Sequence, residues 1–376
     1  MWMAPDSATD EGPAPAAAVP SRRFFPLVDQ LRGVAALLVV YAHLVANFLE
    51  STGHDWMPKS LVDRFLQVPL HGELSMAWPG VALFFFISGF VVTHAASSET
   101  TAEFAVKRFL RIYPPVLLAA LVAAVLAWCG VLVTGLAAAP GAGDLALSVS
   151  LANFLVPGSL VLVAVGWTLV IEVMFYLLVG ALRPLLARRP FVVPLVILAI
   201  CLAAALALPV LSAASRAITY LVFVPVLAMG QVIYLTRMRR IPVWGGALLI
   251  GAAWLVFVFG MERADADLSG PASSFFANVA LAGSVFVIAV LAEGRVGRVP
   301  GLAVVARRSF SLYLLHVPVG FTILTALVVD AQWPYTAAIV VALAATAAAT
   351  ELSYRFVEKP STALARRISR RIRRAP

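Results

Sequence analysis

Charged residues are scarce in this sequence. Asp, Glu, Lys and Arg make up only 12% of its 376 residues, whereas hydrophobic residues make up 62%. An ordinary soluble domain is about 25% charged. The chain has too little polar surface to fold as a soluble globular protein of this length, and its composition therefore indicates a membrane protein.

Cysteine is also scarce. Only Cys129 and Cys201 are present, both within apolar runs. Their spacing matches neither a disulfide framework nor a set of metal ligands. We therefore expect two small buried hydrophobic side chains and no metal site.

Basic residues are missing from the start of the chain. Residues 1–20 contain no Lys or Arg. This excludes a secretory signal peptide, which begins with basic residues directly followed by an apolar run. Because the segment is rich in Ala and Pro, we expect residues 1–23 to form a disordered tail.

Long apolar runs dominate the rest of the sequence. A helix needs about 20 apolar residues to cross about 30 Å of hydrocarbon. We expect an all-α polytopic protein with about ten spans, near 31–49, 78–96, 113–134, 167–183, 191–212, 217–236, 241–260, 274–293, 308–330 and 334–357. The intervening segment 135–166 fits a re-entrant or interfacial piece.

The net charge of +9 does not indicate nucleic acid, because the basic residues form short clusters between the apolar runs. With these spans, only Lys59, Arg64, Arg216 and Arg263 fall on one side, which leaves 24 of the 28 basic residues on the other. Cytoplasmic loops carry such an excess. We expect a multi-pass protein of the cell membrane with both termini in the cytoplasm. Residues 24–360 would form its membrane domain and residues 361–376 a basic cytoplasmic tail.

Two ionisable residues share the first span. Arg32 and His43 are eleven residues apart, about three helical turns, so both side chains point the same way, about 16 Å apart along the axis. Ionisable groups inside spans are costly and indicate functional sites. The alternatives are a charged anchor at the cytoplasmic mouth for Arg32 and an interhelical hydrogen bond for His43.

Further ionisable residues lie in later spans. Glu172 is predicted at the depth of His43, and a carboxylate in hydrocarbon needs a partner. We therefore expect the two to be in contact, in a functional site or a purely structural ion pair. His316 is expected to hydrogen bond to a neighbouring helix. Glu351 and Arg355, four residues apart, are expected to form an ion pair.

Arg108 and Arg111 precede the third span. Three residues apart, they would share one face of a short interfacial helix. They would either anchor the loop to lipid headgroups or clamp a phosphate, because guanidinium groups bind phosphates bidentately.

Six segments, in order and covering residues 24–360, resemble the bacterial membrane acyltransferases of the acyltransferase 3 family. They are 27–37 with Tyr41-Ala42-His43, 84–90, Arg108-x-x-Arg111 with Tyr113-Pro114-Pro115, Trp167-Thr168-Leu169 with Glu172 and Phe175-Tyr176, 311–316, and 354–360. One departure is Val173, where the family often has a second acidic residue.

The resemblance implies transfer of an acyl group, commonly acetyl, from cytoplasmic acyl-CoA to a hydroxyl of a carbohydrate or glycosylated acceptor. Acyl-CoA would be a co-substrate, with no permanently bound cofactor. By the same resemblance, His43 would act at the thioester with Glu172 fixing its tautomer, and three arginines would hold the CoA phosphates: Arg32, Arg108 and Arg111. Substrate or structural support is expected from Ser88, Trp167, Tyr176 and His316.

Two other classes of protein fit some of these features. A proton-coupled transporter or flippase could use His43, Glu172 and His316 as a relay, but it would predict internal repeats, which the sequence does not show. A scaffolding protein would leave the buried ionisable groups without a role. The sequence leaves open the acceptor (polysaccharide, lipid-linked sugar or the sugar of a secreted small molecule) and the oligomeric state.

Overall fold

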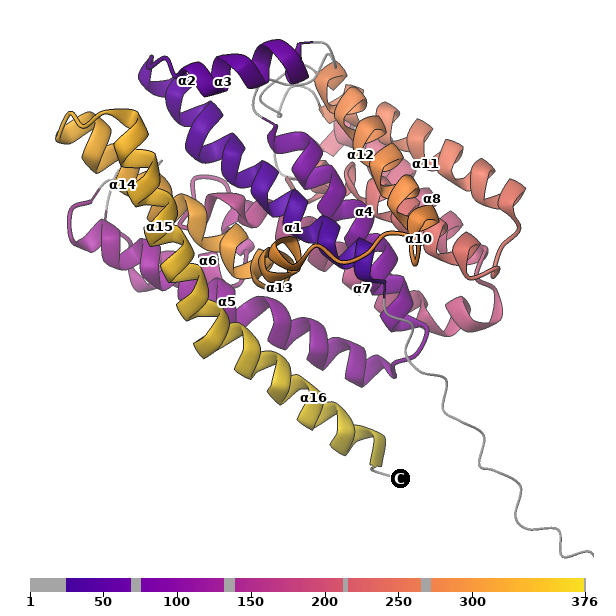
Figure 1. Cartoon of the computed structure of the whole chain (residues 1–376). Helices are drawn as coiled ribbons and strands as arrows, with labels where there is room; N and C mark the ends of the chain where they lie inside the picture. Colours follow the sequence, from indigo (N-terminus) through magenta and orange to yellow (C-terminus); the bar gives the residue numbers. More distant parts are fainter. Residues whose placement is uncertain (1–24, 69–75, 132–138, 212–215, 265–271, 375–376) are drawn as a thin grey trace, which may run out of the picture.

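The computed structural model describes residues 25–68, 76–131, 139–211, 216–264 and 272–374. Within these ranges every regular element is an α-helix or a short 3₁₀ or π segment, and there is no strand (Figure 1). The predicted all-α architecture is confirmed. The predicted disordered tail, residues 1–23, lies outside the described residues.

The first half of the chain forms long helices joined by shorter ones. They are α1 (Pro26–Tyr41), the π segment η1 (Ala42–Asn47), α2 (Phe48–Thr52), α3 (Met57–Val62) with η2 (Asp63–Gln67), α4 (Ala77–Ala96), α5 (Thr101–Trp128), α6 (Ala142–Val149), η3 (Ala152–Phe154), η4 (Ala164–Gly166) and α7 (Trp167–Arg188).

The second half begins with α8 (Val192–Leu211), α9 (Arg216–Leu221), α10 (Val224–Arg237), α11 (Val243–Ala264) and α12 (Ala272–Ala292). Two composite helices follow. The first joins α13 (Pro300–Leu315), η7 (His316–Phe321), α14 (Thr322–Leu324) and η8 (Thr325–Asp330), and the second joins α15 (Tyr335–Ser353), η9 (Tyr354–Glu358) and α16 (Lys359–Arg374).

Nine helices in the described part of the chain are long and apolar enough to cross a membrane. Each overlaps a predicted span. The tenth predicted span, 191–212, is also a helix, α8, but its apolar stretch Val192–Leu208 is shorter than the other nine. The chain is therefore a polytopic α-helical membrane protein.

Contacts between distant segments define the two ends of the bundle. At one end the backbone N–H of Leu27 donates to Glu293 (3.1 Å), and the N–H of Val299 donates to Gln30 (2.7 Å). At the other end the indole N–H of Trp56 donates to Thr336 Oγ1 (3.1 Å). Loops predicted to share a side of the membrane thus meet at the same end.

Helix α4 lies at the centre and packs against α1, α7, α10 and α12. Its contact with α10 depends on small residues. A Cβ added to Gly89 would lie 1.9 Å from the carbonyl oxygen of Leu227, and one added to Gly230 would lie 2.2 Å from that of Phe86. The two backbones therefore touch, as is common between membrane helices.

The third span differs most from its prediction. Helix α5 begins at Thr101, where Thr100 and Glu103 form a capping box, and it continues without a break through Pro114 and Pro115. Membrane helices tolerate such prolines because neighbouring groups satisfy the freed carbonyls. Arg108 and Arg111 consequently lie on a long helix instead of a short interfacial one.

Two smaller expectations also change. The chain beyond residue 360, predicted only as a basic tail, is helical as far as Arg374 and packs against α5. Cys201 is buried as expected, but Cys129 is exposed, because α5 ends at Trp128 and leaves Cys129 as its C-cap.

Candidate active site

A cavity lies among α1, α4, α5, α7 and α13, with about 680 Å³ of space that includes part of the open solvent at its mouth. Six of the nine predicted site residues line it: Arg32, Ser88, Arg108, Arg111, Glu172 and Tyr176. Most of the remaining wall is apolar and comes largely from α4, including Val81, Phe84 and Phe85. The cavity thus combines a cluster of arginines with a surface suited to a hydrocarbon group.

The arginines come from two helices. Arg32 lies on α1 with Nη1 3.8 Å from a carboxylate oxygen of Asp29. The guanidinium of Arg108 on α5 stacks over Phe104 (5.3 Å) and Tyr176 (5.5 Å). The Nε of Arg108 is buried and has no hydrogen-bond partner among the described residues. A buried donor without a partner is uncommon and fits an anionic ligand in the cavity.

Glu172 lies among these arginines. It accepts hydrogen bonds from Ser88 Oγ (2.7 Å) and from the hydroxyl of Tyr176. Three guanidinium groups and one carboxylate line the cavity, and Asp29 lies just outside the lining beside Arg32. The excess of guanidinium groups in the lining favours an anionic ligand.

The predicted contact between His43 and Glu172 is not formed. The hydrogen-bond partners of Glu172 are Ser88 and Tyr176, and His43 lies outside the cavity wall. Position in a span predicts depth, but it does not predict toward which neighbouring helix a side chain points. The expected pairing was based on depth and on the family resemblance.

His43 instead contacts His316. The Nε2 atom of His316 lies 3.3 Å from Nδ1 of His43, and the ring centroids are 5.0 Å apart. His316 is fully buried. The expectation that His316 hydrogen bonds to a neighbouring helix is confirmed, and its partner is the other predicted active-site histidine.

Backbone carbonyls determine the tautomers of both rings. Nδ1 of His43 lies 3.0 Å from the carbonyl oxygen of Val39, and Nδ1 of His316 lies 3.2 Å from that of Leu312. A carbonyl only accepts, so we infer that each neutral ring carries its proton on Nδ1. The single Nδ1–H of His43 is then shared between the carbonyl oxygen of Val39 and Nε2 of His316, and Nε2 of His43 is left unprotonated.

Both histidines lie in π-helical segments, His43 in η1 and His316 at the start of η7. In a π segment the backbone makes i→i+5 hydrogen bonds, and such segments are frequent at functional sites. Here the two π segments, which follow α1 and α13, bring the two imidazoles together.

Tyr313 connects the histidine pair to the cavity. Its ring lines the cavity and lies 6.0 Å from that of His316, centroid to centroid. Its hydroxyl lies 2.8 Å from Oγ1 of Thr168, which also lines the cavity. Sequence reasoning did not single out either residue, although Tyr313 precedes His316 by three residues and so shares its helix face.

Two further predicted residues have other surroundings. Trp167 packs in an aromatic layer with Trp78 and Phe223, both with ring centroids 5.6 Å away, and does not line the cavity. Glu351 forms the predicted ion pair with Arg355 and a second one with Arg308. The ion pair between Arg308 and Glu351 links α13 to α15.

Comparisons with known proteins agree with this architecture. The family model described as an acyltransferase domain, acyltransferase 3, matches residues 26–354. Nodulation protein 10 of Rhizobium leguminosarum bv. viciae is 36% identical over 115 residues, a match that covers 29% of this chain and 27% of that protein. No solved structure matches the chain. Because the family model covers most of the chain, including the cavity and the histidine pair, the protein belongs to the acyltransferase 3 family of membrane acyltransferases.

Proposed function

We propose that the protein transfers an acyl group, acetyl or a similarly short one, from cytoplasmic acyl-CoA to a hydroxyl of a carbohydrate or glycosylated acceptor at the outer side of the cell membrane. The observation that carries this proposal is the cavity itself. It gathers Arg32, Arg108 and Arg111 at one end of the bundle and continues along an apolar wall. Acyl-CoA has the two complementary parts: phosphates for the arginines and an acyl group for the apolar wall.

The arginines would hold the phosphates of CoA. Guanidinium groups bind phosphates bidentately, and Arg108 offers a buried Nε without a partner among the described residues. Glu172 would hold the ring of Tyr176, on which Arg108 stacks, and would offset part of the positive charge of the arginines. This role replaces the one expected for Glu172 beside His43.

His43 would perform the chemistry through Nε2. As a general base, Nε2 takes the proton of the acceptor hydroxyl while its oxygen bonds to the thioester carbonyl carbon. The C–S bond then breaks, and the departing thiolate takes the proton from the imidazolium. If His43 is itself acylated first, the same unprotonated Nε2 is the nucleophile.

His316 would orient His43. Its Nε2 accepts the Nδ1–H of His43 and stabilises the imidazolium that forms. This resembles the part that a carboxylate plays in a serine hydrolase triad. A neutral imidazole serves here because both rings lie in the apolar interior, where an additional charge would be costly.

The test is acyl transfer by the purified protein in detergent. Acyl-CoA labelled in the acyl group is mixed with candidate sugars and glycosides, and free CoA and acylated product are measured. The proposal predicts equal amounts of free CoA and acylated product. A transporter would leave acyl-CoA intact and would instead move solute in proteoliposomes, which would overturn the proposal.

A further inference from the structure

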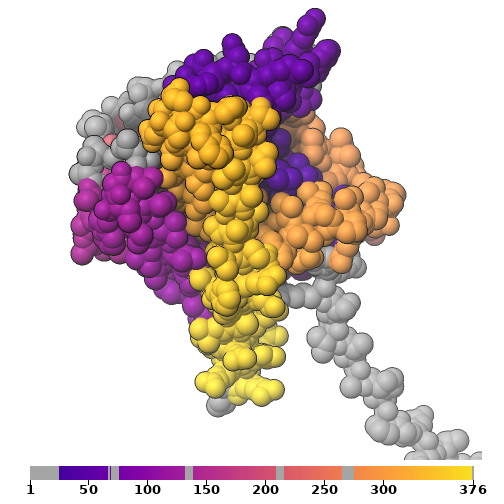
Figure 2. Space-filling view, turned by 60° about the vertical axis from the view of Figure 1, so that its left-hand side comes forward, coloured from indigo at the N-terminus to yellow at the C-terminus, as the bar shows by residue number. Residues whose placement is uncertain are grey.

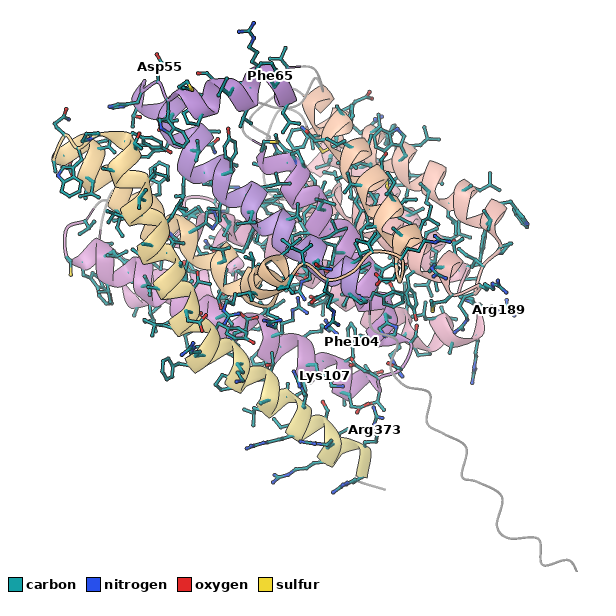
Figure 3. The ribbon with its side chains drawn as sticks, viewed as in Figure 1. Asp55, Phe65, Phe104, Lys107, Arg189 and Arg373 are labelled. Carbon is teal, nitrogen blue, oxygen red and sulfur yellow. The ribbon has the colours of Figure 1, made fainter. Side chains whose placement is uncertain are left out.

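Helix α16 has two distinct faces. Ser361, Ala365 and Ser369, spaced four residues apart, are buried on the side that packs against α5. Arg373 forms a bidentate ion pair with the buried Glu103 of α5, with N–O distances of 3.0 and 3.2 Å. The helix is thus seated on α5, as Figure 3 shows near Lys107 and Arg373.

The other face is basic. Helix α16 contains seven basic residues and no acidic one. Five arginines are exposed and form no ion pair with a described residue: Arg366, Arg367, Arg370, Arg371 and Arg374. In Figure 2 this part of the chain, in yellow, extends beyond the rest of the bundle.

Exposed apolar residues precede the arginines on the same composite helix. Leu352, Phe356 and Leu364 are 58%, 72% and 47% exposed. Leu364 lies three residues before Arg367 and seven before Arg371, so the three share a face. Arg355 and Lys359 are also exposed along this stretch, so the surface changes from mixed apolar and basic before Leu364 to mainly basic after it.

The distances fit a bilayer surface. At 1.5 Å per residue, Arg367 lies about 4.5 Å and Arg371 about 10 Å beyond Leu364 along the axis. The headgroup region on one side is roughly 5–7 Å thick, and the Debye length at physiological salt is about 8 Å. Because the last span is predicted to end near residue 357, Leu364 reaches the headgroup region only where the helix is tilted, and both arginines then lie within reach of headgroup charge.

We propose that the exposed face of α16, Leu364 with the five arginines, binds anionic phospholipid headgroups of the cytoplasmic leaflet. Basic clusters directly after a membrane span are suited to such lipids. A nucleic acid would satisfy the arginines but would not cover the leucine, and the helix continues directly from a candidate membrane span, which places its basic end beside a bilayer. A lipid surface provides anionic and apolar partners together.

The contact has a consequence inside the bundle. Because Arg373 and the buried stripe fix α16 to the start of α5, lipid that holds α16 also holds the helix that carries Arg108, five residues after Glu103. Anionic lipid would therefore reduce local opening of both segments.

Amide hydrogen exchange tests this without any assay of activity. The full chain is placed in nanodiscs of zwitterionic phospholipid alone or with one third anionic phospholipid. We expect exchange in residues 364–374 to be about tenfold slower in the anionic discs, with a smaller slowing in residues 101–107. Equal exchange of residues 364–374 in the two discs would overturn the proposal.

Two charge-matched variants identify the face that responds. Arg367→Gln with Arg371→Gln should lose most of the lipid effect, whereas Arg188→Gln with Arg189→Gln, exposed residues at the end of α7, should keep it. Loss of the effect in both variants would show a response to net charge only and would contradict a site on α16. Should the first variant fail to fold, the comparison of wild-type protein in the two discs still decides.

Discussion

Replacement of His316 by leucine should lower turnover by about 10- to 100-fold while leaving the apparent affinity for acyl-CoA nearly unchanged. The Nδ1–H of His43 would still contact the carbonyl of Val39 at 3.0 Å, so the tautomer of His43 should survive. What is lost is the 3.3 Å contact with Nε2 of His316, which strengthens when His43 becomes cationic.

The magnitude follows from that single contact. A hydrogen bond to a charged group contributes about 1.5–3 kcal/mol, and each 1.4 kcal/mol is a factor of about ten. His316→Gln can place an amide oxygen near Nδ1 of His43 and should recover part of the loss. A purely structural role would instead lower the recovered folded protein for both variants and would not separate them in turnover.

The assay is steady-state acyl transfer at varied acyl-CoA, with the amount of folded protein measured by size-exclusion chromatography. The chain has only five histidines, so ¹⁵N labelling of histidine gives a second readout. We expect two rings protonated on Nδ1, and one of these signals should disappear in each of the variants at positions 43 and 316. Leucine and glutamine variants that both retain more than half of wild-type turnover would refute the orienting role.

Three other predictions concern the cavity and the packing. His43→Ala should abolish acyl transfer without affecting membrane insertion, because general acid–base catalysis alone accelerates such reactions by about 10²–10⁴-fold. Retention of more than about a tenth of the wild-type turnover would show that His43 does not take part in the chemistry. Arg108→Ala and Arg111→Ala should each weaken acyl-CoA binding by about 1.5–3 kcal/mol, measured as a raised KM, and a lower turnover with unchanged KM would indicate a role in orientation instead. Gly89→Ala should lower the melting temperature sharply, because the added Cβ would lie 1.9 Å from the carbonyl oxygen of Leu227. Gly143→Ala is the control and should not lower it, because a Cβ at Gly143 has nothing within 4 Å. Equal melting temperatures for the two variants would contradict the close α4–α10 contact.

The spans were predictable because crossing hydrocarbon requires a long apolar run, and each predicted span overlaps a helix among the described residues. Arg32, Arg108 and Arg111 were grouped by the family resemblance, and their predicted positions on the same side of the membrane are consistent with that grouping. Their shared cavity also contains Ser88, Glu172 and Tyr176, three residues that the family motifs indicated.

The pairing of the histidines was not predictable in the same way. His43 and His316 are 273 residues apart, and they meet through two π segments that hydropathy does not reveal. Depth suggested Glu172 as the partner of His43, but the rotation of α7 about its axis directs Glu172 toward Ser88. Rotation depends on packing among several helices, which a single sequence does not specify. The extension of α5 back to Thr101 was missed because the span was placed from the apolar run, which begins only after the basic residues Lys107, Arg108 and Arg111.

The sidedness of acyl-CoA use tests the proposed function most directly. The protein is reconstituted in sealed vesicles of known orientation, and acyl-CoA is supplied to one face at a time with the acceptor on the other. If the arginine-lined cavity opens to the cytoplasm and the hydroxyl reaches His43 from outside, transfer requires acyl-CoA at the cytoplasmic face and acceptor at the opposite face. Transfer from acyl-CoA supplied only at the extracellular face would contradict both the predicted orientation and the proposed route of the acyl group.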